Sequence, residues 1–234
     1  MSKELLQWYD RIKRDLPWRE DQQPYKIWLS EIMLQQTQVA TVIEYYTRFI
    51  QRYPTVFQLA EASEDEVFKL WEGLGYYSRA RNLLKCAREV VNKHKGEFPK
   101  DIVSLQALPG IGPYTAGAIS SIAFNQKVPA VDGNVLRVIS RLHEIDLPIN
   151  HTKHHAVFHT HVMELMTKRP GDFNQALMEL GATVCTPKSP KCSECPIQNL
   201  CSAYRSNDVL SYPVKLKAPQ KRRVNLAICV IFYE

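Results

Sequence analysis

No long apolar run occurs in the 234-residue sequence, and no stretch approaches the roughly 20 apolar residues of a membrane-spanning helix. Residues 1–8 lack the apolar core of a secretory signal peptide. Internal repeats and low-complexity tracts are also absent, which excludes repeat architectures. These absences predict a cytoplasmic protein without a membrane partner.

A large charge excess is missing as well. Lys plus Arg total 30 against 24 for Asp plus Glu, so the formal net charge is +6. This moderate excess fits an anionic partner but does not require one, because many basic proteins bind no nucleic acid. Hydrophobic residues make up 45% of the chain, which is enough for one large domain or two small ones with a core.

Cysteine is scarce, with six residues in the chain, but four lie close together: Cys185, Cys192, Cys195 and Cys201. A reducing compartment disfavours disulfides, so metal ligation is the first interpretation. Structural zinc commonly uses two short cysteine pairs, whereas the spacing C-x6-C-x2-C-x5-C contains one Cys-x-x-Cys. Four thiolates can instead surround an iron–sulfur cluster. Cys86 and Cys229 lie outside the pattern and are predicted to be core residues.

The strongest local motif lies within residues 105–137, where Leu-Pro-Gly-Ile-Gly-Pro-Tyr-Thr-Ala is followed by Val-Asp-Gly-Asn. Pro109 should end one helix, and Pro113 should open a second one. Between them, Gly110 and Gly112 supply the free backbone angles of a hairpin. The unpaired N–H groups at the start of the second helix, together with its dipole, can bind a phosphate. An ordinary αα-hairpin with a glycine turn is the alternative.

A lone carboxylate, Asp132, follows this hairpin in a loop bounded by Pro129 and Gly133. The order of helix, Pro-Gly-Ile-Gly hairpin, helix and Val-Asp-Gly-Asn resembles the helix-hairpin-helix DNA glycosylases. The resemblance implies a base-excision enzyme that holds the DNA backbone with the hairpin and uses Asp132 on the sugar. By residue type alone, Asp132 could cap the helix that begins near Asn134, and one side chain can do both jobs.

The cysteine spacing matches the iron–sulfur loop of the endonuclease III and MutY glycosylases. That resemblance implies a [4Fe–4S] cluster, which we expect to be structural and to take no part in bond cleavage. Relatives of the endonuclease III type carry a lysine just after the hairpin as the nucleophile of a Schiff base. Here that position is Tyr114, and residues 105–121 contain no lysine. We therefore expect a monofunctional enzyme that leaves an abasic site.

A second carboxylate, Glu31, lies in a helix that is apolar on nearly every face, because only Ser30 and Glu31 are polar within residues 27–34. Burial would raise the pKa of Glu31 towards values useful for a general acid. The alternative places Glu31 on a solvent-facing stripe. The run Ser-Glu-Ile-Met-Leu-Gln-Gln-Thr-Gln resembles the MutY adenine glycosylases, as do Trp-Arg before it and Gly-Leu-Gly-Tyr-Tyr-Ser-Arg after it. This resemblance covers about residues 16–201.

The MutY resemblance implies removal of adenine mispaired with 8-oxoguanine or guanine in double-stranded DNA. The target adenosine is flipped out of the duplex, and Glu31 protonates adenine at N7. Asp132, kept ionised, stabilises the oxocarbenium ion or attacks it transiently before water completes hydrolysis. Tyr114 stands near the sugar, and Asn134 helps to orient Asp132.

The same resemblance assigns residues that handle the bases. Arg19 contacts the flipped adenine. Gln36 and Tyr76 fill the gap left in the duplex, and Thr37 and Leu74 lie beside the orphaned purine. By residue type alone, Tyr76 could be an ordinary loop aromatic.

The helical patterns predict an all-α fold in two lobes with DNA in the cleft. Expected helices include residues 25–38, 78–95 and 174–184. In the second of these, Ser78 and Arg79 begin a basic helix with Arg81 and Lys85, and this helix is predicted to contact the DNA backbone.

By family resemblance, a six-helix barrel lobe spans residues 21–126, and an iron–sulfur lobe joins residues 1–20 to 127–212. Residues 213–234 are predicted to be a basic linker and the first strand of a largely missing C-terminal domain, because a lone strand is not stable. A strand packed on the helical body is the alternative. If the missing part is Nudix-like, we expect weaker discrimination of 8-oxoguanine from guanine.

Two rival functions stay open. A mismatch thymine DNA glycosylase on the same scaffold also lacks the Schiff-base lysine, but the buried acid Glu31 suits protonation of a purine nitrogen better. A non-catalytic DNA binder that uses the cluster as a redox sensor needs neither Glu31 nor Asp132. We further expect a monomer that works at the nucleoid of a prokaryote-like cytoplasm.

Overall fold

The computed structural model describes residues 1–216 and residue 229. Within this part, all regular structure is helical, as the sequence predicts. The α-helices run in the order α1 (Ser2–Ile12), α2 (Pro24–Leu34), α3 (Val39–Arg52), α4 (Val56–Glu61), α5 (Glu64–Trp71), α6 (Tyr77–His94), α7 (Ile102–Ala107), α8 (Pro113–Ile122), α9 (Gly133–His143), α10 (His155–Leu165), α11 (Pro170–Thr183) and α12 (Ser202–Arg205). No helix in the described part is long and apolar enough to cross a bilayer.

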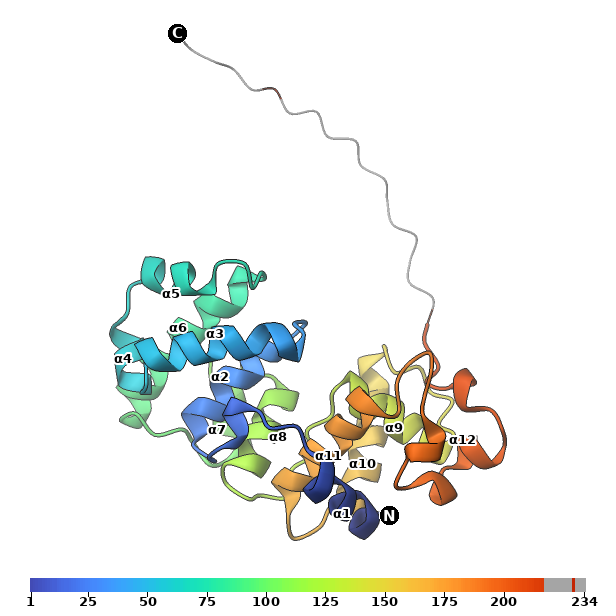
Figure 1. Ribbon diagram of the computed structural model, residues 1–234. Coiled ribbons are helices and arrows are strands. Elements are labelled where there is room, and N and C mark those ends of the chain that lie inside the picture. Colours follow the sequence, from blue (N-terminus) through green and yellow to red (C-terminus); the bar gives the residue numbers. More distant parts are fainter. Residues whose placement is uncertain (217–228, 230–234) are drawn as a thin grey trace.

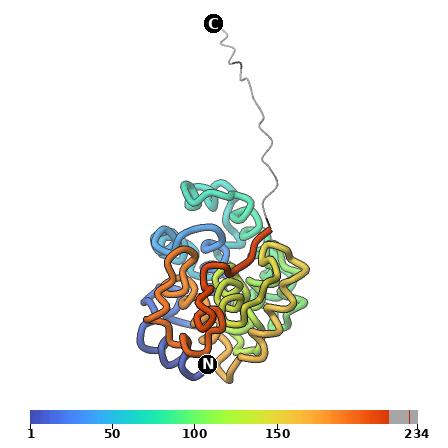
Figure 2. The backbone as a smooth tube through the Cα atoms, turned by 90° about the vertical axis from the view of Figure 1, so that its right-hand side faces the viewer, coloured from blue at the N-terminus to red at the C-terminus, as the bar shows by residue number. Residues whose placement is uncertain are grey.

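Figure 1 shows the helices in two groups, and the buried hydrophobic side chains form a separate cluster in each group. The first cluster contains Leu16, Trp18 and residues of α2 to α8, and Trp28 and Trp71 within it are fully buried. The second joins α1 to α9, α10, α11 and Ile197, so that the start of the chain packs on α11. Figure 2 turns the molecule so that the lobe with this second cluster faces the viewer. The domain boundaries at residues 20/21 and 126/127 stay a prediction.

The helix α8 joins the two halves, because it packs on α2 on one side and on α11 on the other. A Cβ atom added at Gly117, in the middle of α8, would lie 2.2 Å from the carbonyl oxygen of Pro129. Only glycine therefore allows the segment that leads to Asp132 to lie against α8. Asn174 of α11, fully buried, supports the same segment by accepting from the N–H of Ala130 and donating to the carbonyl of Val128.

The hairpin before α8 follows the sequence prediction at one glycine and not at the other. Gly110 has φ +77°, and a Cβ atom there would lie 2.9 Å from Cβ of Asn82. Gly112 instead has the ordinary extended values φ −87° and ψ 179° and caps the N-terminus of α8, with Pro113 next. The prediction that Gly112 needs free backbone angles is wrong, because the chain has already turned at Gly110. A Cβ atom at Gly112 would meet nothing within 4 Å.

Helix α2 ends earlier than the predicted residues 25–38. It stops at Leu34, and Gln36 adopts a left-handed φ of 57°. The carbonyl groups of Ile32 and Met33 accept hydrogen bonds from the guanidinium of Arg79 instead of from the next helical turn. The predicted helix 174–184 begins earlier than expected, at Pro170, because proline is favoured in a first helical turn.

The predicted terminal strand lies outside the described residues, as does most of the predicted linker. Residues 213–216 are described, and Leu216 exchanges two hydrogen bonds with the side chain of Asn150 (2.8 and 3.0 Å). Cys86 is buried, as predicted, whereas Cys229 is exposed and the prediction of a core residue is wrong there. Free cysteine is among the most buried residue types, but that tendency does not decide the position of a single residue.

Candidate active site

A cavity of about 520 Å³ lies where the two halves of the molecule meet, within the size range of small-molecule sites. Its walls come from the loop before α2, from α2 itself, from the starts of α8 and α9, and from α11. The polar and charged side chains among its lining residues are Arg14, Arg19, Ser30, Glu31, Gln35, Gln36, Thr37, Tyr114, Asp132, Asn134, Gln175 and Glu179. Seven of the side chains that the sequence predicted for the site therefore share this one cavity: Arg19, Glu31, Gln36, Thr37, Tyr114, Asp132 and Asn134.

Glu31 is buried on α2, with 7% of its surface exposed, so the solvent-facing alternative is wrong. The hydroxyl of Tyr114 donates to Oε2 of Glu31 at 2.7 Å and lies 3.5 Å from Sδ of Met178. Burial raises the pKa of Glu31 to about 7, with a further rise from the charge of Asp132 and an opposing effect of the Tyr114 bond. Since no described residue bonds to Oε1, that oxygen is free to carry a proton to a ligand.

Asp132 caps α9 and also faces the cavity, so its two predicted roles are compatible. Its Oδ1 accepts from the N–H of Val135 at 2.8 Å, and its Oδ2 accepts from Nδ2 of Asn134 at 2.7 Å. Burial raises the pKa of Asp132, while these hydrogen bonds act in the opposite direction because they favour the carboxylate. Two carboxyl groups with different surroundings thus share one site, the usual arrangement for separate acid and anion roles.

The amide of Asn134 is held in turn by Arg137, which the sequence did not point to. A guanidinium N–H of Arg137 donates to Oδ1 of Asn134 at 2.8 Å, and Nε donates to the carbonyl oxygen of Cys185 at 2.8 Å. With Oδ1 bound to this cation, Nδ2 of Asn134 must face Asp132. The predicted orienting role of Asn134 therefore has a geometric basis.

A second buried carboxylate in the wall, Glu179 of α11, was also missed from the sequence. It is 1% exposed and accepts two hydrogen bonds from Arg14 (2.6 and 3.0 Å) and one from Arg19 (2.8 Å). Burial alone would raise the pKa of Glu179, but the bonds from both arginines outweigh it and the pKa is lowered. The available signal was a lone charge in an apolar helix, Ala-Leu-Met-Glu-Leu-Gly, the same signal that singled out Glu31.

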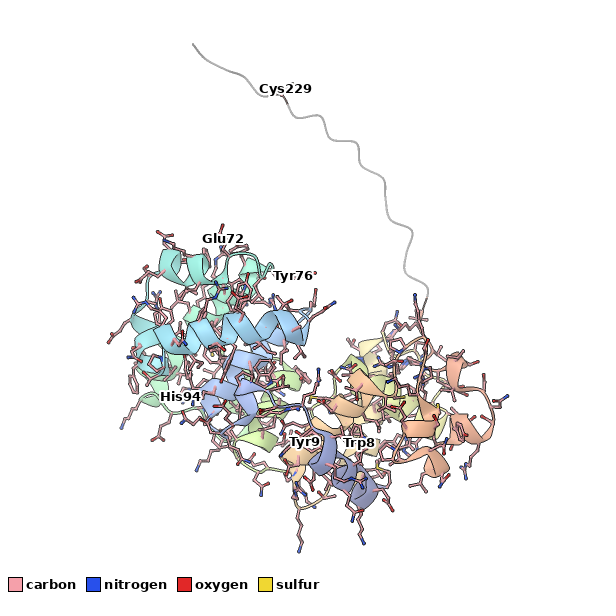
Figure 3. All side chains as sticks on the ribbon, viewed as in Figure 1. Trp8, Tyr9, Glu72, Tyr76, His94 and Cys229 are labelled. Atoms are coloured by element: carbon pink, nitrogen blue, oxygen red, sulfur yellow. The ribbon has the colours of Figure 1, made fainter. Side chains whose placement is uncertain are left out.

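The other residues that the sequence predicted to contact DNA do not line the cavity. Tyr76 is 60% exposed in the turn before α6, at the rim of the molecule seen in Figure 3. Leu74 is 5% exposed and belongs to the first hydrophobic cluster. Gly110 and Gly112 lie in the hairpin before α8 and do not line the cavity. Arg79 is buried and bound to protein carbonyls, whereas Arg81 and Lys85 on the same helix are exposed, so a contact of this helix with the DNA backbone stays a prediction.

The four clustered cysteines line a second, apolar cavity beneath Arg141. The guanidinium of Arg141, 1% exposed, lies 3.3 Å from Sγ of Cys185 and also binds the carbonyl of Thr186. Burial raises the pKa of the Cys195 thiol to about 12, so binding of iron must displace protons from these thiols.

Comparison with known proteins reveals extensive similarity to curated adenine DNA glycosylases. The chain is 54% identical to that of Mus musculus over 211 residues, which cover 86% of this chain and 41% of the mouse protein. It is 53% identical to that of Homo sapiens over 209 residues, which cover 85% of this chain and 38% of the human protein. The chain thus spans about two fifths of the length of these relatives.

Among solved structures, a thermostable thymine-DNA glycosylase matches with a TM-score of 0.79 and 31% identity, over 88% of this chain and 95% of that chain. Residues 185–201 match the model of the iron–sulfur binding domain of endonuclease III. This match supports a [4Fe–4S] cluster, and the four clustered cysteines, which line one cavity within the matched segment, are the ligands that we propose for it.

Loss of one cluster ligand is expected to destabilise the loop that the cluster holds. Cys195→Ser should lose its iron and the associated visible absorption, and its melting temperature should fall by about 5 °C or more, because metal binding contributes to folding. Iron analysis, the absorption spectrum and limited proteolysis of residues 185–201 measure the effect. Cys229→Ser, at an exposed cysteine, is the control and should match the wild type. Equal iron content in the two variants would contradict the assignment of Cys195.

The family model for HhH-GPD base excision DNA repair proteins matches residues 29–157, which include the hairpin, Glu31, Tyr114 and Asp132. This segment spans more than half of the chain. The chain therefore belongs to the HhH-GPD superfamily of base excision DNA repair proteins.

Proposed function

We propose that this chain excises adenine mispaired with 8-oxoguanine or guanine in double-stranded DNA, as a monofunctional glycosylase. The observation that carries the proposal is the pair of carboxyl groups in one cavity: Glu31, with a pKa of about 7, and Asp132, held by Asn134 and Val135. The curated relatives named adenine DNA glycosylase support the choice of base.

In this mechanism the adenosine leaves the duplex and enters the cavity. Glu31 transfers the proton on Oε1 to adenine N7, so that the base departs as neutral adenine when the glycosidic bond breaks. The sugar becomes an oxocarbenium ion, whose positive charge the carboxylate of Asp132 stabilises or captures transiently. Water then adds to the sugar carbon and loses a proton, leaving an abasic site. Arg19, held by Glu179 in the cavity wall, would contact the adenine.

We propose that the hairpin before α8 binds the phosphate backbone of the DNA. The N–H groups at the start of this helix and its dipole favour a phosphate, and Gly112 leaves open space for one. Gln36 and Tyr76 would occupy the gap in the duplex, with Thr37 and Leu74 beside the orphaned purine. The two-lobe division at residues 20/21 and 126/127, the monomeric state and a place at the nucleoid belong to the same proposal.

The thymine glycosylase alternative is supported by the structural match at 31% identity. A carboxylic acid with a pKa near 7 favours adenine instead, because adenine N7 is a basic ring nitrogen and thymine offers no comparable one. A non-catalytic DNA binder would gain nothing from burying Glu31 beside Asp132, since such burial costs stability.

Single-turnover assays on four duplexes test the function: adenine opposite 8-oxoguanine, guanine or cytosine, and thymine opposite guanine. We expect alkali-labile abasic sites from the first two duplexes. Release of thymine would show that the chain is a mismatch thymine glycosylase instead. Binding to the duplexes without release of any base would show a DNA-binding protein without glycosylase activity.

Borohydride should trap no covalent DNA adduct during adenine release. A trappable imine needs an amine nucleophile, and no lysine is among the described residues that line the cavity. The residue after Pro113 is Tyr114, whose hydroxyl is bound to Glu31. The assay compares strand breakage with and without alkali and runs a lysine-dependent glycosylase as positive control. An adduct formed by this chain would contradict the monofunctional mechanism.

A further inference from the structure

Arg79, in the first turn of α6, binds two separate turns of the chain at once. On one side its guanidinium donates to the carbonyl oxygens of Ile32 (3.1 Å), Met33 (2.9 Å) and Gln35. On the other side it donates to those of Leu74 (3.1 Å) and Gly75 (3.2 Å), and it also reaches the hydroxyl of Thr37 (3.2 Å). The side chain is 8% exposed, so these contacts replace solvent.

Each of these two turns contains a non-glycine residue in the left-handed region. Gln36 has φ 57° and Tyr76 has φ 49°, a region that residues with a Cβ atom adopt at a cost. Such conformations persist where their surroundings determine them. Arg79 binds the carbonyl of Gln35 and that of Gly75, which belong to the peptide groups directly before Gln36 and Tyr76. It therefore fixes the peptide plane from which each of these side chains projects.

No described carboxylate forms an ion pair with Arg79, so its charge is balanced by carbonyl dipoles and aromatic faces. Its guanidinium carbon lies 5.4 Å from the ring centres of both Trp71 and Tyr76. A lysine in its place could not span both turns, because its ammonium group is a single point donor and guanidinium is a planar fork. The arrangement requires arginine specifically.

We propose that Arg79 is a positioning residue that locks the turns of Gln36 and Tyr76 into one rigid unit, so that both side chains enter the DNA together when the adenine leaves the duplex. This inference rests on the proposed function, because it concerns the opening step of the same reaction. Arg79 itself touches neither the base nor the sugar. Its loss should therefore slow the opening of a paired duplex and spare the chemistry on an adenine that is already unpaired.

The test compares Arg79→Lys with Arg88→Lys in the full chain. Arg88 is a matched control on the same helix, since its guanidinium also clamps carbonyl groups, those of Ala60 (3.1 Å) and Ala62 (2.9 Å). Single-turnover release is measured for adenine opposite 8-oxoguanine in a paired duplex and for adenine within an unpaired bubble. Fluorescence of 2-aminopurine at the target position reports unstacking directly, and all assays run at 10 °C to keep both variants folded.

We expect Arg79→Lys to slow release from the paired duplex by about 10- to 100-fold and to reduce the unstacking signal, while release from the bubble stays near the wild-type rate. Arg88→Lys should match the wild type on both substrates. Equal losses on duplex and bubble, wild-type rates on both, or a variant that does not fold at 10 °C would each overturn the proposal. Failure of the wild type to release adenine from either substrate would instead refute the proposed function.

Discussion

Asp132→Asn is expected to lower the single-turnover rate of adenine release by about 10³-fold while the protein stays folded. Asparagine removes the negative charge that would stabilise the oxocarbenium ion. It keeps the cap of α9, because asparagine and aspartate are comparable N-cap residues and the bond to the N–H of Val135 can still form. The melting temperature separates this loss of activity from unfolding.

Asp101→Asn provides a matched control for that variant. Asp101 caps α7 by accepting from the N–H of Ser104 at 2.8 Å, and it does not line the cavity. This control should release adenine at the wild-type rate. If Asp132→Asn retained activity within a few-fold of Asp101→Asn, the anion assigned to the reaction would have to come from another group.

Glu31→Gln is expected to lower the rate by about 10²- to 10⁴-fold, the usual contribution of a general acid. In the wild type, release should be fastest below pH 7 and should fall as the pH rises through about 7, because only the protonated form of Glu31 can donate. The variant should show no such fall, since glutamine does not titrate. A rate that rises through pH 7 in the wild type would show that Glu31 acts as a base and would falsify its role as the acid.

The same substitution, which lowers the reaction rate, is expected to make the protein more stable relative to the wild type as the pH rises. The pKa of Glu31 is about 7 in the fold against an ordinary 4.5, so the folded state holds the proton more tightly than the unfolded state. The wild type should therefore lose about 3 kcal/mol relative to Glu31→Gln between pH 4 and pH 8. Denaturant unfolding of both proteins at these pH values measures the difference. A parallel pH dependence would mean that Glu31 is more solvated than its 7% exposure indicates.

Much of this protein could be predicted from short-range features of the sequence. The all-helical class followed from apolar periodicity, and the turn at Gly110 followed from a glycine that must adopt positive φ. Glu31 was singled out because its helix has almost no polar face to turn towards water, although this pattern left a solvent-facing position open. The four cysteines were marked by their spacing. In each of these cases the physical cause lies within a few residues of its effect.

The failures share a different cause. Helix α2 ended early because Arg79, remote in sequence, took the carbonyls that a further turn would have used. The basic start of α6 suggested a DNA contact, but the two terminal nitrogens of the Arg79 guanidinium are bound to protein oxygens. Gly112 was assigned a backbone role that Gly110 alone fulfils. Glu179 carried no motif, and its importance lies in partners from the N-terminal segment, Arg14 and Arg19.

The sequence by itself determined which chemical groups are available: the glycine hairpin, the carboxylate of Asp132 at a helix start, the apolar helix around Glu31 and the cysteine spacing. Only the tertiary structure decided that Glu31, Tyr114 and Asp132 share one cavity, because α8 must pack on α2 and α11 at the same time. It also decided the pKa of Glu31, since desolvation and the charge of Asp132 depend on what surrounds a group in space. Local propensities act over a few residues, whereas burial and charge act across the whole fold.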